Sequence, residues 1–475
     1  MTATQSPRQC DLAIVGGGAA GVLVALHALR TAAPARHVAL FEPASALAQG
    51  IAYATPWPEH LLNVPAGRMS ALPDAPDDFL DYLLQVDAFP GMPRDAVAAE
   101  YAPRRCYAAY LQARLEQAQA SSPAQLSVVH EAVTALQPGI ATQQLMLADG
   151  EAWQARQVVL ACGNSMRPLP VTGADALPPG KVVDAWDYDG VRLLAGDGDL
   201  AIIGSGLSMA DSVVALANAG HRGRIHVLSR HALLPLPHAH GGTASFDPGP
   251  LPGLPLRQAV RTLRGHARDA VAQGLPWQSV MDRIRPLGQA LWRGLEAADQ
   301  RRFLRHVVRY WDVHRHRIAE SVEAQLAALE QSGQLQRHRA RLDTVLVLDG
   351  TLQVHAHGAA GGLPPLRVGA LINATGVETR ATAMRNPLVQ QLLADGHARP
   401  GPHGLGLDTS VAHAELLAAN GQPHPGVQVV GSLRIGTLWE SLAIPELRVQ
   451  AQQAAARAGL TPCVGGPAAT PRGNG

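Results

Sequence analysis

Two stretches of the chain repeat one pattern of apolar residues followed by glycines. Residues 11–18 read DLAIVGGG and residues 199–206 read DLAIIGSG, so the copies lie 188 residues apart (199 − 11). Each copy starts as a short, largely β-branched run, typical of a buried parallel strand, and passes through glycines into helical spacing. The pattern therefore predicts two strand–turn–helix units, each opening a parallel α/β domain.

The first copy completes G-x-G-x-x-G with Gly16, Gly18 and Gly21. In this pattern the first glycine permits a tight turn, the second lets a pyrophosphate approach the backbone, and the third allows close helix–strand packing. The phosphates then face the positive N-terminus of the helix, which here begins near Ala19 and Ala20. Glycine turns also arise for purely structural reasons, so the strand that follows is the necessary check.

The ends of the following strands separate the two copies by charge. HVALFE (37–42) ends in Glu42, and the same offset leads to Arg230 (42 + 188), at the end of IHVLSR (225–230). A carboxylate here accepts hydrogen bonds from a ribose and repels a 2′-phosphate, whereas a cation suits a 2′-phosphate. We therefore predict a dinucleotide without a 2′-phosphate at the first unit, and NADPH at the second, beside Ser229 and Arg230.

The second copy keeps Gly204 and Gly206 but carries Met209 in place of the third glycine. This departure puts the close packing of helix on strand in doubt, not the phosphate contact. Leu207 and Ser208 then open the helix that would face the phosphates.

Two further strands end in turns of small residues. QVVLACG (157–163) follows the first nucleotide unit and GALINATG (369–376) follows the second. Their places fit the crossings by which a chain passes between two nucleotide-binding domains, although two unrelated strands with glycine turns would give the same pattern. The cofactor-binding candidates in these turns are Cys162, Gly163, Thr375 and Gly376.

The order of these features resembles the two-dinucleotide-binding flavoproteins, and specifically the class B flavin monooxygenases and their relatives. Longer strings are similar to a bacterial family described as FAD/NAD(P)-binding proteins, and this similarity covers nearly the whole chain up to about residue 460. The strings are GIAYATPWPEHLLNVPAGRMSALPD (50–74), YAPRRCYAAYL (101–111), LSRHALLPLPH (228–238), YWDVHRHRIAE (310–320) and GTLWESLAIPELR (436–448).

A more distant similarity links the chain to the N-hydroxylating monooxygenases. In those enzymes a proline-containing loop precedes an F-L-x-Y-L helix, and a P-x-R-x-x-x-x-Y-L helix follows. The matching residues here are Phe79, Leu80, Tyr82 and Leu83, then Pro103, Arg105, Tyr110 and Leu111 in part. The G-D pair of the family's C-terminal flavin contact appears as Gly431 and Ser432, which puts a ribityl contact there in doubt.

The resemblance implies that FAD occupies the first unit and NADPH the second. Flavin reduced by NADPH would react with O2 to form a C4a-peroxide that oxygenates a small molecule, with amine N-hydroxylation as the favoured reaction. Two alternatives stay open. One is a reductase or dehydrogenase that uses both cofactors without oxygenation, and the other is a flavin-binding regulatory or assembly protein.

Three side chains are candidates for a place near the flavin or the substrate. Arg68 lies in the NVPAGRMS loop, His238 follows LLPLP, and Arg315 lies in WDVHRHR, where it would meet a substrate carboxylate or the NADPH phosphates. A structural loop arginine, a satisfied loop histidine and a charged helix end are the corresponding structural alternatives. His314 and His316 are two residues apart and do not share a helix face, so we predict no metal site there.

The C-terminal part begins with VQVVG (427–431), a buried strand, and is expected to continue as a helix through Trp439, Glu440 and Ala443, with Pro445 in its first turn. Such a helix N-terminus would stabilise negative charge on a reduced flavin, although an ordinary closing βα unit would show the same pattern. The remaining cofactor-binding candidates are Asn63, Gly431, Glu440 and Ala443.

The patterns predict an α/β fold with two Rossmann-like dinucleotide-binding domains and an inserted helical subdomain. The FAD-binding domain would be discontinuous, at 1–170 and 371–462, around an NAD(P)-binding domain at 180–250 and 333–370. Residues 254–332 lack strand pattern and show helical spacing, which predicts the insert.

The charge of the insert is locally basic. Its arginines include Arg283, Arg285, Arg293, Arg301, Arg302, Arg305 and Arg309. Asp282, Glu296 and Asp299 interrupt the run and aromatic platforms are few, so the pattern favours a solvated helix face over a nucleic-acid surface.

Composition removes several other classes of protein. The chain has 475 residues, 47% hydrophobic and 16% charged, with a net charge of +1, so no global electrostatic argument favours nucleic acid or membrane. Its four cysteines form no C-x-x-C, which argues against zinc ribbons and dithiol chemistry and suits a reducing compartment. The apolar run 12–29 contains glycines and lacks a basic leader, so we expect a cytoplasmic protein. The Gly/Pro/Ala-rich tail at 465–475 is expected to be disordered.

Overall fold

Both predicted strand–turn–helix units are present in the computed structural model, which describes residues 7–358 and 361–459. The units are β1 (Arg8–Val15) with α1 (Ala19–Thr31), and β9 (Leu200–Ile203) with α6 (Leu207–Asn218). Each lies in the parallel part of its own sheet, so the predicted α/β class with two Rossmann-like domains is confirmed. The tail predicted at 465–475 lies outside the described residues.

The first sheet has the order β17–β18–β6–β1–β2–β3, and its central strands are parallel. β17 runs antiparallel at one edge, and the hairpin of β4 and β5 pairs antiparallel with β6. In the middle of the sheet Ile14 stands between Leu40 and Val159. The further bounds are β2 (His37–Phe41), β3 (Gln125–Val129), β4 (Val133–Gln137), β5 (Gln143–Leu147), β6 (Ala152–Leu160), β17 (Glu415–Leu417) and β18 (Pro423–Val429).

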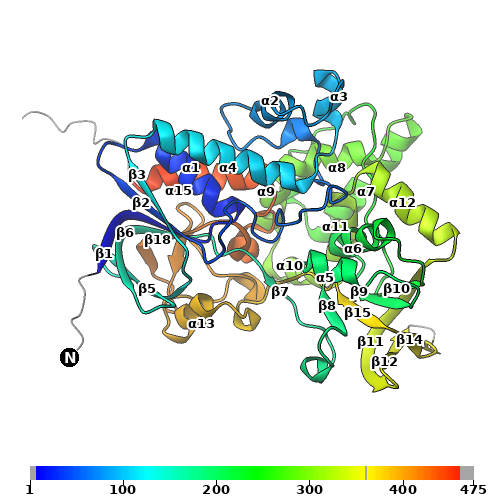
Figure 1. The fold of residues 1–475 in the computed structure, drawn as a ribbon. Coiled ribbons are helices and arrows are strands. Elements are labelled where there is room, and N and C mark those ends of the chain that lie inside the picture. The colour runs from blue at the N-terminus through cyan, green and yellow to red at the C-terminus, as the bar shows by residue number, and fades with distance from the viewer. Residues whose placement is uncertain (1–6, 359–360, 460–475) are drawn as a thin grey trace, which may run out of the picture.

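Helices from both ends of the chain cover one face of this sheet. There α1 packs against α4 (Arg104–Ser121) and α15 (Ile444–Arg457), as Figure 1 shows. The core beneath them contains the fully buried Leu26, Tyr107 and Tyr110. The other face is covered by α13 (Pro387–Ala394) and the β4–β5 hairpin. Short helices α2 (Asp78–Gln85) and α3 (Arg94–Ala99) lie in the connection before α4.

The second sheet has the order β13–β12–β11–β10–β9–β15–β8, with β14 pairing with β12. Strands β8 to β11 and β15 are parallel, and β12 turns back antiparallel along β11. Three helices pack on one face, namely α5 (Tyr188–Leu193), α6 and α12 (Glu320–Gln331). The bounds are β8 (Val182–Asp184), α5 (Tyr188–Leu193), β10 (Ile225–Ser229), β11 (Leu335–Leu348), β12 (Thr351–Gly358), β13 (Gly361–Gly362), β14 (Leu366–Val368) and β15 (Ala370–Asn373).

One predicted domain boundary is wrong. Residues from 371 onward were expected to belong to the first domain, but β15 pairs with β8 and β9 in the second sheet. The first domain resumes only after this strand. The sequence did not indicate which sheet this strand joins, because buried parallel strands show the same hydrophobic pattern in either sheet.

The two crossings between the domains lie side by side. β7 (Ser165–Met166) and β16 (Val377–Glu378) form an antiparallel pair of their own. The Arg167 carbonyl accepts hydrogen bonds from Asn373 Nδ2 (2.9 Å) and Thr375 Oγ1 (3.0 Å). The turns that follow LACG and NATG are thus fastened to one another, which fixes both strand ends at the domain junction.

Helices make up the segment between β10 and β11. They are α7 (Leu256–Ala272), α8 (Gln278–Ile284), α9 (Gly288–Gly294), α10 (Ala297–Arg302), α11 (Val308–Arg315) and α12 (Glu320–Gln331). A π-helical turn, Phe303–Val307, separates α10 from α11. Within the described ranges, every helix is too short or too polar to span a bilayer.

Candidate functional site

Gly16 sets the shape of the first glycine turn. Its φ is +106°, where L-residues rarely lie, and a Cβ there would overlap the Ala161 carbonyl oxygen. A Cβ at Gly21 would overlap the Gly16 carbonyl oxygen, so α1 passes close to the turn. At Gly18, Gly50 alone lies near among the described residues, with its Cα 3.5 Å from the Cβ position. The backbone at Gly18 is therefore accessible to a pyrophosphate.

Helix α1 begins without a capping group. Gly18 is its N-cap, no side chain accepts a hydrogen bond from the first turn, and that turn contains no acidic residue. Within the described residues the N–H groups of Ala19 and Ala20 have no acceptor. An anion bound there would satisfy these donors at the positive end of the helix.

Glu42 lies directly after β2, where the ribose contact was predicted. Its carboxylate accepts hydrogen bonds from the N–H groups of Gly17 (2.7 Å) and Ala44 (3.0 Å). A carboxylate has about four acceptor positions, so about two remain for ribose hydroxyls. The same side chain thus fixes the glycine turn and places negative charge beside it.

The second turn reproduces the first. Gly204 has φ +113°, and a Cβ there would overlap the Ala374 carbonyl oxygen, as at Gly16 and Ala161. Gly206 is the N-cap of α6, again without a capping side chain or an acidic first turn. Met209, in the place of the third glycine, is fully buried. The second helix therefore offers the same uncapped N-terminus.

Arg309 reaches this second turn from the insert. Its Nη2 donates to the carbonyl oxygens of Ser205 (2.8 Å) and Leu233 (2.8 Å), and Nη1 lies 3.9 Å from the Cβ position of Gly206. Burial lowers the pKa of Arg309, and nearby Arg230 lowers it further. The expectation of a solvated insert arginine is wrong here, because tertiary packing brings this guanidinium over the turn.

The C-terminal part returns to the first turn. Gly431 has φ +84°, its Cβ position lies 3.7 Å from the Ala20 Cβ, and its N–H donates to Gln450 Oε1 (3.2 Å). Ser432 Oγ donates to the Gly163 carbonyl oxygen (2.8 Å). Three separately predicted cofactor-binding positions, at Ala20, Gly163 and Gly431, are thus brought together.

The helix expected through Trp439, Glu440 and Ala443 is interrupted. α14 (Ile435–Leu438) ends before Trp439, whose φ is +60°, and α15 begins only after Ala443, with Pro445 in its first turn as predicted. The Trp439 ring stacks on Trp292 of the insert, with centroids 5.1 Å apart. Tertiary packing has overridden the helical pattern.

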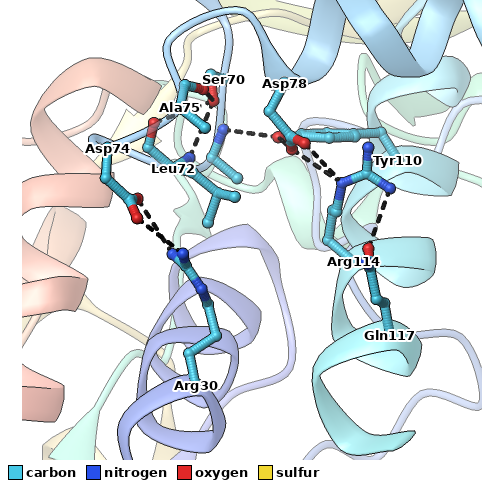
Figure 2. A network of polar contacts seen from close by, with 10 residues as sticks. Arg30, Ser70, Leu72, Asp74, Ala75, Asp78, Tyr110, Arg114 and Gln117 are labelled. Carbon is cyan, nitrogen blue, oxygen red and sulfur yellow. Dashed lines mark hydrogen bonds and ion pairs between the residues drawn. The ribbon is translucent and has the colours of Figure 1, made fainter. Parts of the chain in front are cut away.

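A polar network fastens the loop that carries Arg68 (Figure 2). The Tyr110 hydroxyl donates to Asp78 (2.5 Å) and accepts from the Ala71 N–H (3.0 Å), and Arg114 donates to Asp78 (2.9 Å). Two further contacts are the Arg30–Asp74 ion pair (2.8 Å) and the bond from Arg448 to the Ser70 carbonyl (2.9 Å). The loop is therefore held by α1, α4 and α15, while Arg68 itself is exposed.

His238 lies where both domains and the insert meet. Its Nε2 donates to the Asn63 carbonyl oxygen (3.0 Å), its ring lies 5.2 Å from that of Tyr101, and its N–H donates to the Ile318 carbonyl (3.0 Å). Burial lowers the pKa of His238 to about 4, and Arg317 contributes. The imidazole is thus neutral near pH 7. His238 joins the three parts through one side-chain bond to Asn63 and one backbone bond to Ile318.

Arg315 faces carboxylates of the C-terminal part. Its side chain is 7% exposed, and Nη2 lies 3.2 Å from Glu440 Oε2 and 3.8 Å from Glu446 Oε1. Trp311 Nε1 donates to the other oxygen of Glu440 (3.0 Å). Glu440 therefore links the insert to the C-terminal part, and a direct contact of Glu440 or Arg315 with a ligand stays a prediction.

Further charged groups surround this pair. Burial lowers the pKa of Arg285 to about 10, with Arg315 and Arg68 adding to the effect, and burial raises the pKa of Asp312 to about 6. Arg285 Nη2 and Glu446 Oε2 are buried and have no hydrogen-bond partner in the described part of the chain. Unsatisfied buried groups of both signs point to a polar ligand site at this junction.

The comparisons with known proteins agree with this geometry. Residues 13–165 match a family described as FAD-NAD(P)-binding. No curated protein is similar to the sequence at a significant level. Among solved structures, the ornithine N-hydroxylase of Kutzneria sp. 744, in a complex with reduced FAD, NADP+ and L-ornithine, has a TM-score of 0.64 at 16% identity, covering 95% of this chain and 99% of that one.

The chain has the fold of the two-dinucleotide-binding flavoproteins. The L-lysine 6-monooxygenase of Pseudomonas syringae shares it with a TM-score of 0.62 at 16% identity, covering 94% of this chain and 99% of that one. The bacillithiol disulfide reductase of Bacillus cereus also matches, with a TM-score of 0.55 at 14% identity and coverage of 95% and 99%. Identities this low establish the fold alone.

The sequence did not single out Tyr101, Glu446 or Asp312, and it assigned Arg285 and Arg309 to a solvated face. One signal was available for part of this set. Arg309, Asp312 and His316 are spaced by three and four residues, which places them on one side of a helix. The π-helical turn before α11, a feature frequent at functional sites, is visible only in the structure.

Proposed function

We propose that this protein is a FAD- and NADPH-dependent monooxygenase that oxygenates a small molecule, preferentially at an amine nitrogen. One observation carries the proposal. Two glycine turns open onto uncapped helix N-termini, and the matched strand ends carry Glu42 in one case and Arg230 in the other. The fold that presents them is shared over nearly the whole chain with N-hydroxylating enzymes.

The first turn suits FAD. The N–H groups of Ala19 and Ala20 would bind its pyrophosphate beside the backbone of Gly18, and Glu42 would accept hydrogen bonds from the adenosine ribose. Gly431 supports the assignment because it lies against α1 at this turn.

The second turn suits NADPH. The N-terminus of α6 at Leu207 and Ser208 would bind the pyrophosphate, with Arg309 adding positive charge over Gly206. Arg230, exposed at the end of β10, would pair with the 2′-phosphate. Arginine binds phosphate through two parallel hydrogen bonds, so this end of the sheet favours NADPH over NADH.

Bound FAD would supply the redox chemistry between NADPH and O2, which side chains do not supply. The chain's own contribution is position and enclosure. His238, neutral and bonded to Asn63, holds the second domain and the insert against the first. Arg315, Glu440 and Trp311 close the insert over the C-terminal part, which would exclude water from the reacting groups.

A substrate that carries both an ammonium and a carboxylate would provide hydrogen-bond partners for the unsatisfied charged groups at the junction. Arg285 offers an unpaired buried donor and Glu446 an unpaired buried acceptor. The neighbouring structures include enzymes named for ornithine, lysine and cadaverine, all of which are amines. We therefore favour an amino acid or related amine as substrate.

Matched valine substitutions at the two N-cap glycines test the cofactor sites. At Gly18 and Gly206 the Cβ has space, so Gly18→Val and Gly206→Val should fold while blocking a phosphate. The wild type should purify yellow and bleach with NADPH under anaerobic conditions. Gly18→Val should purify without flavin, whereas Gly206→Val should keep flavin but react with NADPH at least about 100-fold more slowly, a loss of about 2.7 kcal/mol.

The reaction with air separates the alternatives. Substrate-dependent NADPH use with hydroxylamine formation from an added amine is expected. Release of hydrogen peroxide alone, whatever amine is added, would indicate a reductase instead. A colourless wild type, or a Gly18→Val variant with full flavin, would contradict the assignment of the first site.

A further inference from the structure

Helix α7 carries four arginines on one face. Arg257, Arg261, Arg264 and Arg268 are spaced by four, three and four residues, which at about 100° per residue places them within an arc of about 60°. All four are exposed, and across residues 7–358 and 361–459 none forms an ion pair or a hydrogen bond. Like charges at these spacings repel and weaken a helix, and no ion pair in the described chain offsets that repulsion.

The arginines border a groove of about 770 Å³. Its apolar floor contains Leu256, Val260 and Val307, which belong to the cluster built around the buried Trp292 and Phe303. The floor is therefore the outer surface of a packed core.

The far side of the groove adds one more cation, Arg302 of α10. Asp299, a carboxylate that also lines the groove, pairs with Arg302 (2.7 Å) and accepts a hydrogen bond from the Leu256 N–H (2.9 Å). Within the described chain this acid pairs with none of the four arginines of α7, which therefore stay available.

We propose that this groove docks an acidic amphipathic helix of a partner protein. The arginine stripe runs for 11 residues (268 − 257), or about 16 Å along the axis, which matches about three turns of a second helix lying alongside. The apolar floor would take the apolar face of that helix, and the arginines would pair with carboxylates on its flank. Arginine suits this role because its planar donors bind a carboxylate through two hydrogen bonds.

Other polyanions fit less well. Single-stranded nucleic acid requires aromatic side chains on which bases stack, and the residues that line the groove include none. A bilayer requires a helix with a large exposed apolar face, but Ala259 and Ala270 of α7 are buried against the insert. The groove uses no residue of either dinucleotide site, so the proposal stands apart from the proposed reaction.

A labelled peptide tests the surface. The probe is a fluorescein-labelled synthetic helix of about 18 residues, with leucines on one face and glutamates on its flank. The matched peptide has glutamine in place of every glutamate. Binding to the full-length protein is followed by fluorescence anisotropy at low and at high salt, with a single-stranded oligonucleotide and phosphatidylglycerol vesicles as further probes.

Two double variants locate the site. Arg261→Glu with Arg264→Glu should weaken binding of the glutamate peptide by about tenfold or more, because two attractive contacts become repulsive. Arg341→Glu with Arg367→Glu, at exposed positions of β11 and β14, should leave binding unchanged. If the first variant does not fold, Arg261→Gln with Arg264→Gln replaces it, with a smaller loss expected.

The expected result is salt-sensitive binding of the glutamate peptide that fails with the glutamine peptide and with the α7 variant. The proposal is overturned if the glutamate peptide does not bind, if both peptides bind equally, or if the β-strand variant loses as much affinity. Tighter binding of the oligonucleotide or the vesicles would assign the face to that ligand instead.

Discussion

At the scale of single residues, Gly16 and Gly204 occupy equivalent positions at which no side chain fits. Gly16 packs on Ala161 and Gly204 on Ala374, in each case where a Cβ would overlap a carbonyl oxygen of the neighbouring strand end. Both adopt a positive φ that L-residues rarely tolerate. Both positions could be predicted from the sequence, because the steric requirement for glycine appears there as glycines at a fixed spacing after a strand. Among the buried charges of the junction, Arg309 and Asp312 left only their helical spacing as a signal.

Asp312 provides a test at this scale. Burial raises its pKa to about 6 from the value of 3.8 expected in the unfolded chain. The unfolded chain therefore releases this proton first as pH rises, so the stability that the protonated carboxyl contributes is present below about pH 4 and is lost through about pH 6. Asp312→Asn cannot ionise, and its free energy of unfolding should rise relative to wild type between pH 4 and 7, by about 1–3 kcal/mol.

Urea unfolding at pH 4, 5.5 and 7 measures this difference. Asp343→Asn, at an exposed position of β11, controls for the loss of an aspartate as such. A difference between Asp312→Asn and wild type that stays constant from pH 4 to 7 would contradict the buried carboxyl.

At the scale of elements, the matched strand ends of the two units differ in charge. β2 and β10 occupy equivalent places beside β1 and β9, and the residue after each strand sets the local charge. Local hydrophobic patterns also gave a wrong prediction for one helix. The helical pattern around Trp439 was overridden because its ring stacks on Trp292 of the insert, about 150 residues earlier in the sequence.

Removal of the cation at one end of β10 should change cofactor preference. Arg230→Ala should raise the KM for NADPH about 10- to 150-fold, the equivalent of about 1.5–3 kcal/mol for a charge-assisted hydrogen bond, while barely changing the KM for NADH. Arg224→Ala, directly before the same strand, is the matched control and should change neither value. Steady-state kinetics with NADPH and with NADH give the KM values for this comparison. Equal effects of Arg230→Ala on NADPH and NADH would refute the phosphate contact.

At the scale of the whole molecule, polar contacts hold the two domains together. Arg104 at the start of α4 pairs with Asp211 of α6 (2.8 Å), with side chains 15% and 17% exposed. The Tyr188 hydroxyl donates to the Ile51 carbonyl (2.7 Å), and Arg192 pairs with Glu59. The two sheets lie in separate parts of the molecule (Figure 1), and these contacts fix their separation.

A double-mutant cycle measures the coupling free energy between Arg104 and Asp211. Arg104→Met and Asp211→Asn should each destabilise the protein by about 1–3 kcal/mol, because each leaves a largely buried charge without its partner. The double variant should lose less than the sum of the two, with a coupling of about 1 kcal/mol or more. Arg222 and Asp197 form an exposed pair within the second domain and serve as the control cycle, in which no coupling is expected. Additive losses at Arg104 and Asp211 would show that the pair does not join the domains.

The sequence by itself determined the two strand–turn–helix units, the charge at their strand ends and the helical character of the insert. Each of these depends on residues close together in the chain, where spacing and steric demand act directly. Only the tertiary structure decided that β15 joins the second sheet, that Arg309 covers the second turn and that Glu440 pairs with Arg315. Those outcomes depend on contacts between distant segments, whose energies come from packing and charge pairing that no local pattern encodes.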